Sequence, residues 1–292
     1  MRRPSEKIIE FGLATSGAIT ILVTLGIIWV LFSESYNFFK VVSLWDFLTD
    51  TQWTPLFTQK HYGILPLLTG TLLTTVIAVI TAMPIGLTIA IYLSEYAHKS
   101  FRKRVKPLME ILAAIPTVVY GFFALTVVTP FLQSFIPGVG TFNALSAGLV
   151  MGIMITPLVT SLSEDALYAV PKSLREASFG MGATRFQTSF KVVVPAASSG
   201  ITVSLILAIG RAIGETMVVA VAAGQQPILT LDPRNGVETI TSYIVQISLG
   251  DVAHGSIEYN TIFAAGVTLF IFTFILNQIS YRLKKRYQEK YE

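Results

Sequence analysis

Residues 176–195 read EASFGMGATRFQTSFKVVVP, a charged and glycine-bearing stretch between two apolar runs. The small residues Ala177, Ser178, Gly180 and Gly182 allow close approach of backbones, and a glycine also permits a turn between two helical pieces. Pro171, just upstream, suits the first turn of a helix, where its missing N–H has no intrahelical partner. The stretch therefore predicts a short helix, a turn and a second helix, with an apolar face formed by its Phe and Met side chains.

The sequence on both sides of this stretch is that of a membrane protein. Hydrophobic residues make up 52% of the chain, charged residues only 13%, and the mean hydropathy is +0.64. An apolar helix needs about 20 residues to cross the hydrocarbon core of a bilayer. Six runs meet that length: 11–33, 64–93, 108–132, 143–163, 193–224 and 259–282. We expect an all-α membrane protein with six transmembrane helices, the first of them a retained anchor.

The basic residues predict how the chain is oriented. Of the 21 Lys and Arg residues, 17 lie before the first run, after the last run, or in the connections at 99–106 and 172–191. The other connections hold only Lys40, Lys60 and Arg234. Because short cytoplasmic loops collect Lys and Arg, both termini and residues 176–195 should be cytoplasmic. The high calculated pI then follows from topology, and no nucleic-acid partner is needed.

Two longer connections should face outside. The first, residues 34–63, is rich in aromatic side chains, including Trp45 and Trp53. We interpret these as anchors at the membrane interface, with contact to an external partner as the alternative. The second, residues 225–258, carries four acidic residues against the single base Arg234. It either receives a soluble binding protein or is acidic simply because of its side of the membrane.

One charged pair lies inside an apolar run. Arg211 and Glu215 are four residues apart, so in a continuous helix they share a face and should meet. Each charge at the centre of a membrane helix costs on the order of 3 kcal/mol on insertion scales. The face should therefore point into the bundle or a watery path, and Gly210 and Gly214 should let another helix approach closely. The pair is either a structural ion pair or part of a path for an anion.

The spacing within 176–195 resembles the coupling motif of ABC importer permeases. The motif is carried by Glu176, Ala177 and Ser178, then Gly182, and finally Val192, Val194 and Pro195; Ser178, Val192 and Val194 are conservative departures. The resemblance implies a type I ABC importer permease fold, six transmembrane helices and a cytoplasmic coupling helix. It also implies that Glu176, Ala177, Ser178, Gly182 and Pro195 dock on a separate ATPase. We expect an anchor helix and outer loop at 1–63 and a permease domain at 64–292, with the coupling loop at about 165–195.

Two further segments are similar to the permease subunits of ABC-type phosphate importers (PstC-like). They are IPTVVYGFF at 115–123 and GRAIGETM at 210–217. The resemblance covers nearly the whole chain, and the long first outer connection favours a PstC-like over a PstA-like subunit. It implies four kinds of partner: a second, PstA-like permease, two PstB-like ATPase subunits, a PstS-like external phosphate-binding protein, and phosphate itself.

The same resemblance assigns Arg211 and Glu215 to the substrate pathway in the bacterial inner membrane. A guanidinium group presents a planar fork of donors that suits phosphate oxygens. As a hypothesis, Glu215 holds that fork while the path is empty, and it accepts the remaining O–H of hydrogen phosphate while repelling sulfate.

The chain is not expected to be an enzyme. It contains no phosphate-binding loop of the form GxxxxGK[ST], so ATP hydrolysis must come from another polypeptide. With no Cys and three scattered His residues, we expect no metal site and no cofactor. Glu164 and Asp165 are candidates for contact with the coupling loop. The alternatives are a permease for another oxyanion (phosphonate, sulfate or molybdate), a secondary transporter that uses Arg211 and Glu215 as a proton relay, and a purely structural subunit.

Overall fold

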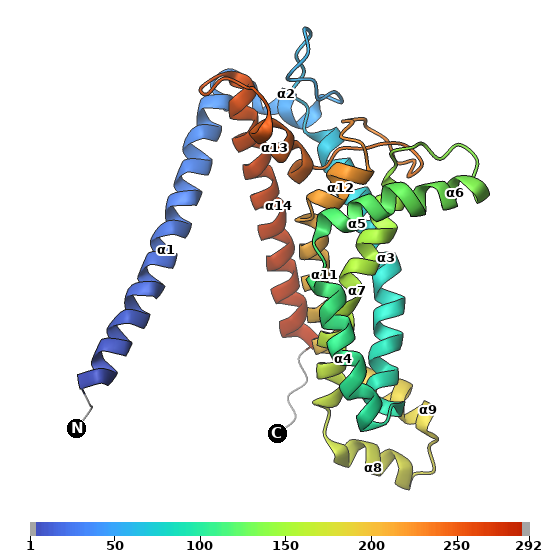
Figure 1. Cartoon of the computed structure of the whole chain (residues 1–292). Coiled ribbons are helices and arrows are strands. Elements are labelled where there is room, and N and C mark those ends of the chain that lie inside the picture. The colour runs from blue at the N-terminus through green and yellow to red at the C-terminus, as the bar shows by residue number, and fades with distance from the viewer. Residues whose placement is uncertain (1–3, 288–292) are drawn as a thin grey trace.

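A computed structural model describes residues 4–287 of the chain, and these are helical, without a regular strand. Four helices form the bundle: α3 (Leu65–Ile91), α7 (Ala144–Tyr168), α11 (Ser198–Ile213) and α14 (Ile257–Tyr287). Helix α1 (Pro4–Phe39) leans away from them and meets α14 at one end only (Figure 1). The shorter helices are α2 (Leu44–Thr49), α4 (Lys99–Ala114), α5 (Thr117–Phe123), α6 (Thr129–Phe135), α8 (Lys172–Gly180), α9 (Arg185–Thr188), α10 (Val194–Ala196), α12 (Met217–Ala222) and α13 (Ile240–Leu249). Three π-helical turns, Tyr92–Tyr96, Ala124–Val128 and Ser189–Val193, extend α3, join α5 to α6 and join α9 to α10.

The apolar runs of the sequence correspond to helices of membrane-spanning length. Five helical stretches are long and apolar enough to cross a membrane, and a sixth is reached if the bent pair Arg185–Ala196 and Ser198–Ile213 counts as one span. The helix α8, the start of α1 and the end of α14 lie at the same end of the molecule (Figure 1). We call this the inner end and the opposite one the outer end. The predicted all-α membrane fold is confirmed.

The third predicted span, 108–132, is wrong as a continuous helix. Helix α4 ends at Ala114, and Ile115 is extended, with φ −64° and ψ 131°. The cause is Pro116, which has no N–H to donate and disfavours helical backbone in the residue before it. The apolar stretch long enough to span is Thr117–Phe135, whereas α4 is a separate amphipathic helix without a buried residue.

The fifth predicted span, 193–224, is also interrupted. Its axis bends by 69° at Ala197, where α11 begins, and α11 ends at Ile213. Residues 214–216 break the helix before α12. The Thr241 hydroxyl donates to the Glu215 carbonyl at 2.7 Å, which satisfies one acceptor freed by the break. Breaks of this kind are tolerated in a membrane when neighbouring groups take up the freed backbone bonds.

Small residues bring α3 and α7 into close contact at the centre of the bundle. A Cβ added at Gly152 would lie 2.6 Å from the Thr81 Cβ, and one added at Gly148 would lie 2.7 Å from the Ile77 Cβ. No real side chain could occupy that space. Association between membrane helices depends on such close packing, because lipid supplies no hydrophobic driving force between them. The pair α3 and α7 is therefore the fixed frame against which the other helices are placed.

The outer end is held together by an aromatic core. Trp53 is 1% exposed and packs edge-to-face on Phe47 and Tyr243, with ring centroids 6.2 and 5.0 Å away. Trp53 and Tyr62 form an isolated antiparallel β-bridge, which brings the two ends of the intervening loop together. Our interpretation of Trp53 as an interfacial anchor is thus wrong, because it is buried among outer-end side chains, whereas Trp45 is exposed.

Candidate functional site

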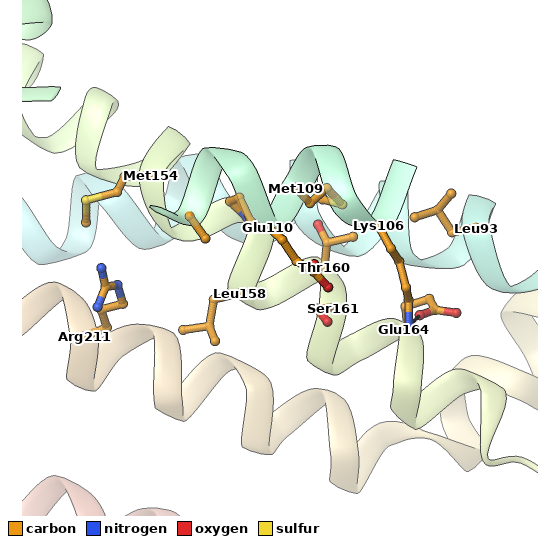
Figure 2. Close-up of a pocket in the computed structure, with 12 residues that line it drawn as sticks. Leu93, Lys106, Met109, Glu110, Met154, Leu158, Thr160, Ser161, Glu164 and Arg211 are labelled. Carbon is orange, nitrogen blue, oxygen red and sulfur yellow. Dashed lines mark ion pairs between the residues drawn. The ribbon is translucent and has the colours of Figure 1, made fainter. Parts of the chain in front are cut away.

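A cavity of about 340 Å³ lies between α4, α7 and α11 in the inner half of the bundle. Figure 2 shows Arg211 at one end of this inner cavity and Lys106 and Glu164 at the other, with Glu110 between them. The remaining lining is mostly apolar and comes from Leu93, Met109, Ala113, Met154, Pro157 and Leu158, with Thr160 and Ser161 adding hydroxyl groups. The cavity thus combines apolar walls with a small number of charged groups, as ligand sites commonly do.

Arg211 is the charged residue at the outer end of this cavity. It lies in the last turn of α11 and is exposed, and its side chain extends from α11 into the cavity (Figure 2). Among the described residues no carboxylate lies within ion-pair distance of its guanidinium group. An unpaired guanidinium in a mostly apolar cavity is suited to an oxyanion, because its planar group presents several donors in a fixed fork that can bind two oxygens.

Glu215 does not meet Arg211, so that prediction is wrong. The pairing required a continuous helix, but α11 ends at Ile213 and Glu215 lies in the break. There the carboxylate is buried, at 7% exposure, and accepts a bond from the backbone N–H of Val218 at 3.4 Å. It therefore cannot hold the Arg211 fork while the path is empty. No helix among the described residues packs closely on Gly210 either, since nothing lies within 4 Å of a Cβ placed there; α14 lies across a cavity from it.

The inner end of the cavity holds a cluster of charges that the sequence analysis did not assign. Glu164 is 0% exposed and pairs with Arg102 and, at 2.7 Å, with Lys106. The bond that the Lys106 ammonium donates to the Glu164 carboxylate raises the pKa of Lys106, so this ammonium stays charged. Asp165 also pairs with Lys106, at 3.0 Å. The i, i+4 spacing of Arg102 and Lys106 could have indicated one basic face on α4.

These pairs show that the side chains of Glu164 and Asp165 bind α4. They do not make the contact with the coupling loop that the sequence predicted. The contact with that loop comes from Glu95, after α3. Arg175 on α8 donates to both Glu95 oxygens, at 2.8 and 3.2 Å. It also donates to the carbonyl oxygens of Val170 and Leu167, at 2.6 and 2.8 Å. One guanidinium thus ties α8 to the inner ends of both α3 and α7.

Residues 172–188 form the expected helix, turn and helix. Gly182 sits in the turn with φ +80°, a left-handed conformation that glycine adopts without strain. Thr184 and Gln187 form a capping box at the start of α9. The Ser178 hydroxyl bonds to that of Thr188 at 2.9 Å, which joins the two helices, whereas Glu176, Ala177 and Pro195 are exposed.

An apolar patch is exposed on this loop. Met181 is 89% exposed, and Phe186 and Phe190 contact one another with ring centroids 4.6 Å apart. Phe179 is exposed beside them. Exposed aromatic and Met side chains are typical of surfaces that bind another protein. No group of three or more His, Asp or Glu side chains suited to a metal ion occurs within residues 4–287.

Comparison with known proteins places this geometry in context. The family described as "Binding-protein-dependent transport system inner membrane component" matches residues 82–289. The probable ABC transporter permease protein YqgH of Bacillus subtilis is 39% identical over 235 residues, which are 80% of this chain and 75% of that protein. The phosphate transport system permease protein PstC of Mesorhizobium japonicum is 33% identical over 285 residues, which are 91% of this chain and 86% of that protein.

Solved structures agree on the fold. A chain of a bacterial alginate ABC transporter, solved in complex with an alginate pentasaccharide-bound periplasmic protein, matches with a TM-score of 0.64 over 98% of both chains. The sequence identity is 17%, so this likeness concerns the fold alone. The fold is that of ABC importer permeases.

Proposed function

We propose that this chain, which belongs to the family of binding-protein-dependent transport system inner membrane components, forms half of a path for inorganic phosphate across the bacterial inner membrane. The observation that carries the proposal is Arg211, a guanidinium group that lines a cavity between three helices and has no ion partner among the residues that the structure describes. Similarity to phosphate transport permeases over 91% of the chain supports the choice of phosphate as the anion.

Arg211 would bind the substrate directly. Its fork of donors fits two phosphate oxygens, and the mostly apolar walls of the inner cavity offer the anion few competing partners. At the other end, Lys106 is already neutralised by Glu164 and Asp165, so it offers less attraction to a passing anion. A phosphate ion would therefore be held at Arg211 and released past Lys106 toward the inner end. Glu215 serves this site indirectly in our proposal, by fixing the break that ends α11 beside Arg211.

The chain is a multi-pass membrane protein, and its partners follow from the proposed role. A PstA-like permease would form the other half of the path, PstB-like subunits would hydrolyse ATP, and a PstS-like protein would deliver phosphate from outside. Glu176, Ala177, Ser178, Gly182 and Pro195 would dock in a groove of the ATPase, with both chain termini cytoplasmic. We also propose the division at residue 63 between an anchor region and the permease domain.

The test is radiolabelled phosphate uptake by cells that carry Arg211→Gln, with membrane level and ATPase co-purification measured in the same preparation. The matched control is Arg104→Gln, because Arg104 is exposed on α4 and does not line the inner cavity. We expect uptake to fall at least tenfold in Arg211→Gln and to stay near wild type in the control, with the complex assembled in both.

Three results would contradict the proposal. Retained phosphate uptake in an assembled Arg211→Gln complex would make the residue structural. Uptake of sulfate or molybdate by the wild-type complex, without uptake of phosphate, would assign the path to another oxyanion. Uptake that depends on a proton gradient and not on ATP would instead indicate a secondary transporter.

A further inference from the structure

A second cavity, of about 300 Å³, opens at the outer end between the two outer loops. Its walls come from Trp53, Pro55, Leu56 and Phe57 on the first loop, from Gln225, Gln226, Pro227, Ile228 and Glu238 on the second, and from Tyr243 and Gln246 on α13. The loop between α2 and α3 projects beyond the ends of the helices (Figure 1). This outer cavity lies at the end of the molecule opposite the coupling loop and shares no residue with the inner one.

Glu238 is the acidic group of this cavity. It is 1% exposed, and its Oε1 has no hydrogen-bond partner among the described residues. Other acids of the outer loops are paired: Asp50 with His61, Asp232 with Arg234, and Glu258 with Lys60. Burial without a base raises the pKa of Glu238 to about 8, because the charged form is poorly solvated. A buried polar atom without a partner is rare and calls for an explanation.

The groups around Glu238 favour a cationic ligand. Trp53, Phe57 and Tyr243 present aromatic rings to the cavity, and rings of this kind attract ammonium and guanidinium groups. Gln225, Gln226 and Gln246 add amide oxygens that can accept hydrogen bonds. Among the residues that the structure describes, no Lys, Arg or His lines the cavity, so a positive charge would find one carboxylate and no repelling base there.

The rim of the cavity indicates that this cation belongs to a protein. Leu56, Phe57 and Ile228 are exposed around the opening, and Leu229 and Leu231 are exposed on the adjoining loop. Apolar side chains around a small buried polar centre are typical of a protein interface, in which Arg and aromatic residues supply much of the binding energy. A free small cation would not need such a rim.

We propose that a Lys or Arg side chain of the external binding protein enters this cavity and pairs with Glu238 when the two proteins dock. The inference rests on the proposed function, because it requires an importer that receives such a protein at its outer end. It adds the residue, the cavity and the chemistry of the contact.

Pairing with a cation changes the protonation of Glu238, and this change can be measured. The incoming cation favours the ionised carboxylate, so docking releases one proton from Glu238 wherever that group is protonated beforehand. Docking should therefore tighten as the pH rises toward 8, with about a fivefold gain from pH 7 to 8. Tyr243 interacts electrostatically with Glu238, and Tyr62 interacts with Tyr243; neither tyrosine changes charge in that range, because burial raises the pKa of both.

The experiment measures docking of the purified, phosphate-loaded external binding protein to the whole importer complex in lipid nanodiscs. Dissociation constants are compared between pH 6.5 and 8.5 for wild type and Glu238→Gln. The matched control is Asp251→Asn, since Asp251 is an exposed acid of the same outer end that does not line the cavity. A third variant, Phe57→Ala, tests the rim at an exposed position that cannot disturb the core.

We expect Glu238→Gln to weaken docking on the order of tenfold at pH 8.5 and to abolish its dependence on pH. Asp251→Asn should retain both affinity and pH dependence, and Phe57→Ala should weaken docking while keeping the pH dependence. Unchanged docking and pH dependence in Glu238→Gln would overturn the inference alone. Failure of the binding protein to dock on the wild-type complex would instead overturn the proposed function. Binding of methylguanidinium by the complex alone, lost in Glu238→Gln without effect on docking, would assign the cavity to a small cation and would also overturn the inference.

Discussion

Glu164 and Glu238 lie at opposite ends of the molecule and are almost equally buried, at 0% and 1% exposure. Their surroundings differ in one respect. Arg102 and Lys106 both pair with Glu164, whereas no base within the described residues pairs with Glu238. Burial alone therefore does not define the role of a carboxyl group. Glu164 fastens α4 to α7, and Glu238 is left available for a group from outside the chain.

The same contrast separates two arginines of the inner half. Arg175 donates hydrogen bonds to Glu95 and to two backbone carbonyls, while Arg211 has no ion partner within the described residues. Glu164 and Arg175 each hold helices together through their partners, whereas Arg211 and Glu238, which have no ion partner among the described residues, each line a cavity. We infer that internal pairing marks the framework of this permease and that its absence marks the surfaces that meet phosphate or a partner protein.

The largest effect should come from removing the paired glutamate. Glu164→Gln leaves Arg102 and Lys106 without their shared carboxylate, and breaking a buried ion pair costs on the order of 3 kcal/mol. We expect a clear drop in the thermal unfolding temperature of the solubilised complex. Asp165→Asn is the control, because Asp165 binds the same lysine but is exposed, and it should change stability by less than about 1 kcal/mol. Equal effects of the two variants would remove the distinction between framework and surface at the inner end.

Removing the unpaired glutamate, Glu238, should increase the stability of the protein, whereas removing Glu164 should decrease it. Glu238 has a pKa of about 8 in the folded protein, against 4.5 for an ordinary Glu, so the folded state retains a proton that the unfolded chain loses. Its contribution to stability is present below pH 4.5 and is lost as the pH rises to 8. Glu238→Gln should be close to wild type in stability near pH 5 and more stable than wild type at pH 8. A variant that is destabilised at both pH values would show that Glu238 has an internal partner after all.

Sequence reasoning predicted the membrane helices because length and apolar composition determine what can cross a bilayer. It failed where helices break inside apolar runs. Pro116 was visible in the sequence, and its effect on Ile115 could have been anticipated. The break after Ile213 was not anticipated, and the hydroxyl that takes up one of its freed carbonyls belongs to Thr241, far along the chain.

The candidate site was predictable to a similar extent. Arg211 could be singled out because a base inside an apolar run is costly and therefore informative. Its supposed partner was wrong, since the i, i+4 rule holds only within a continuous helix. The charges that line the same cavity come from α4 and α7, and the support of the coupling helix comes from Glu95. Contacts between residues so distant in sequence follow from the packing of helices, which composition does not reveal.

A smaller effect is expected from Arg175, which shows how the framework reaches the coupling loop. Arg175→Gln removes the ionic bond to Glu95, and hydrogen bonds between charged groups contribute about 2 kcal/mol. Amide hydrogen exchange in residues 172–180 should accelerate, and ATPase activity stimulated by the binding protein should fall. Arg175→Lys should give an intermediate result, since it keeps the charge and loses the two-bond geometry. If exchange is unchanged in Arg175→Gln, the coupling helix is held by its apolar contacts and not by this arginine.

The smallest effect separates backbone conformation from charge at the same inner end. Gly182 has φ +80° with open space around it, so Gly182→Ala meets no steric clash and suffers only the strain of a left-handed alanine, about 1 kcal/mol. Gly180 is equally open but ends α8 with ordinary helical backbone, so Gly180→Ala should stabilise slightly, by about 0.5 kcal/mol. Thermal unfolding and co-purification of the ATPase subunit measure both variants. Neither residue carries charge or contacts a side chain. If Gly182→Ala lowers the stability and Gly180→Ala raises it, the difference is therefore due to the backbone conformation of the turn. If the two variants behave alike, the left-handed turn does not set the angle between α8 and α9, and the capping box of Thr184 and the bond between Ser178 and Thr188 must do so instead.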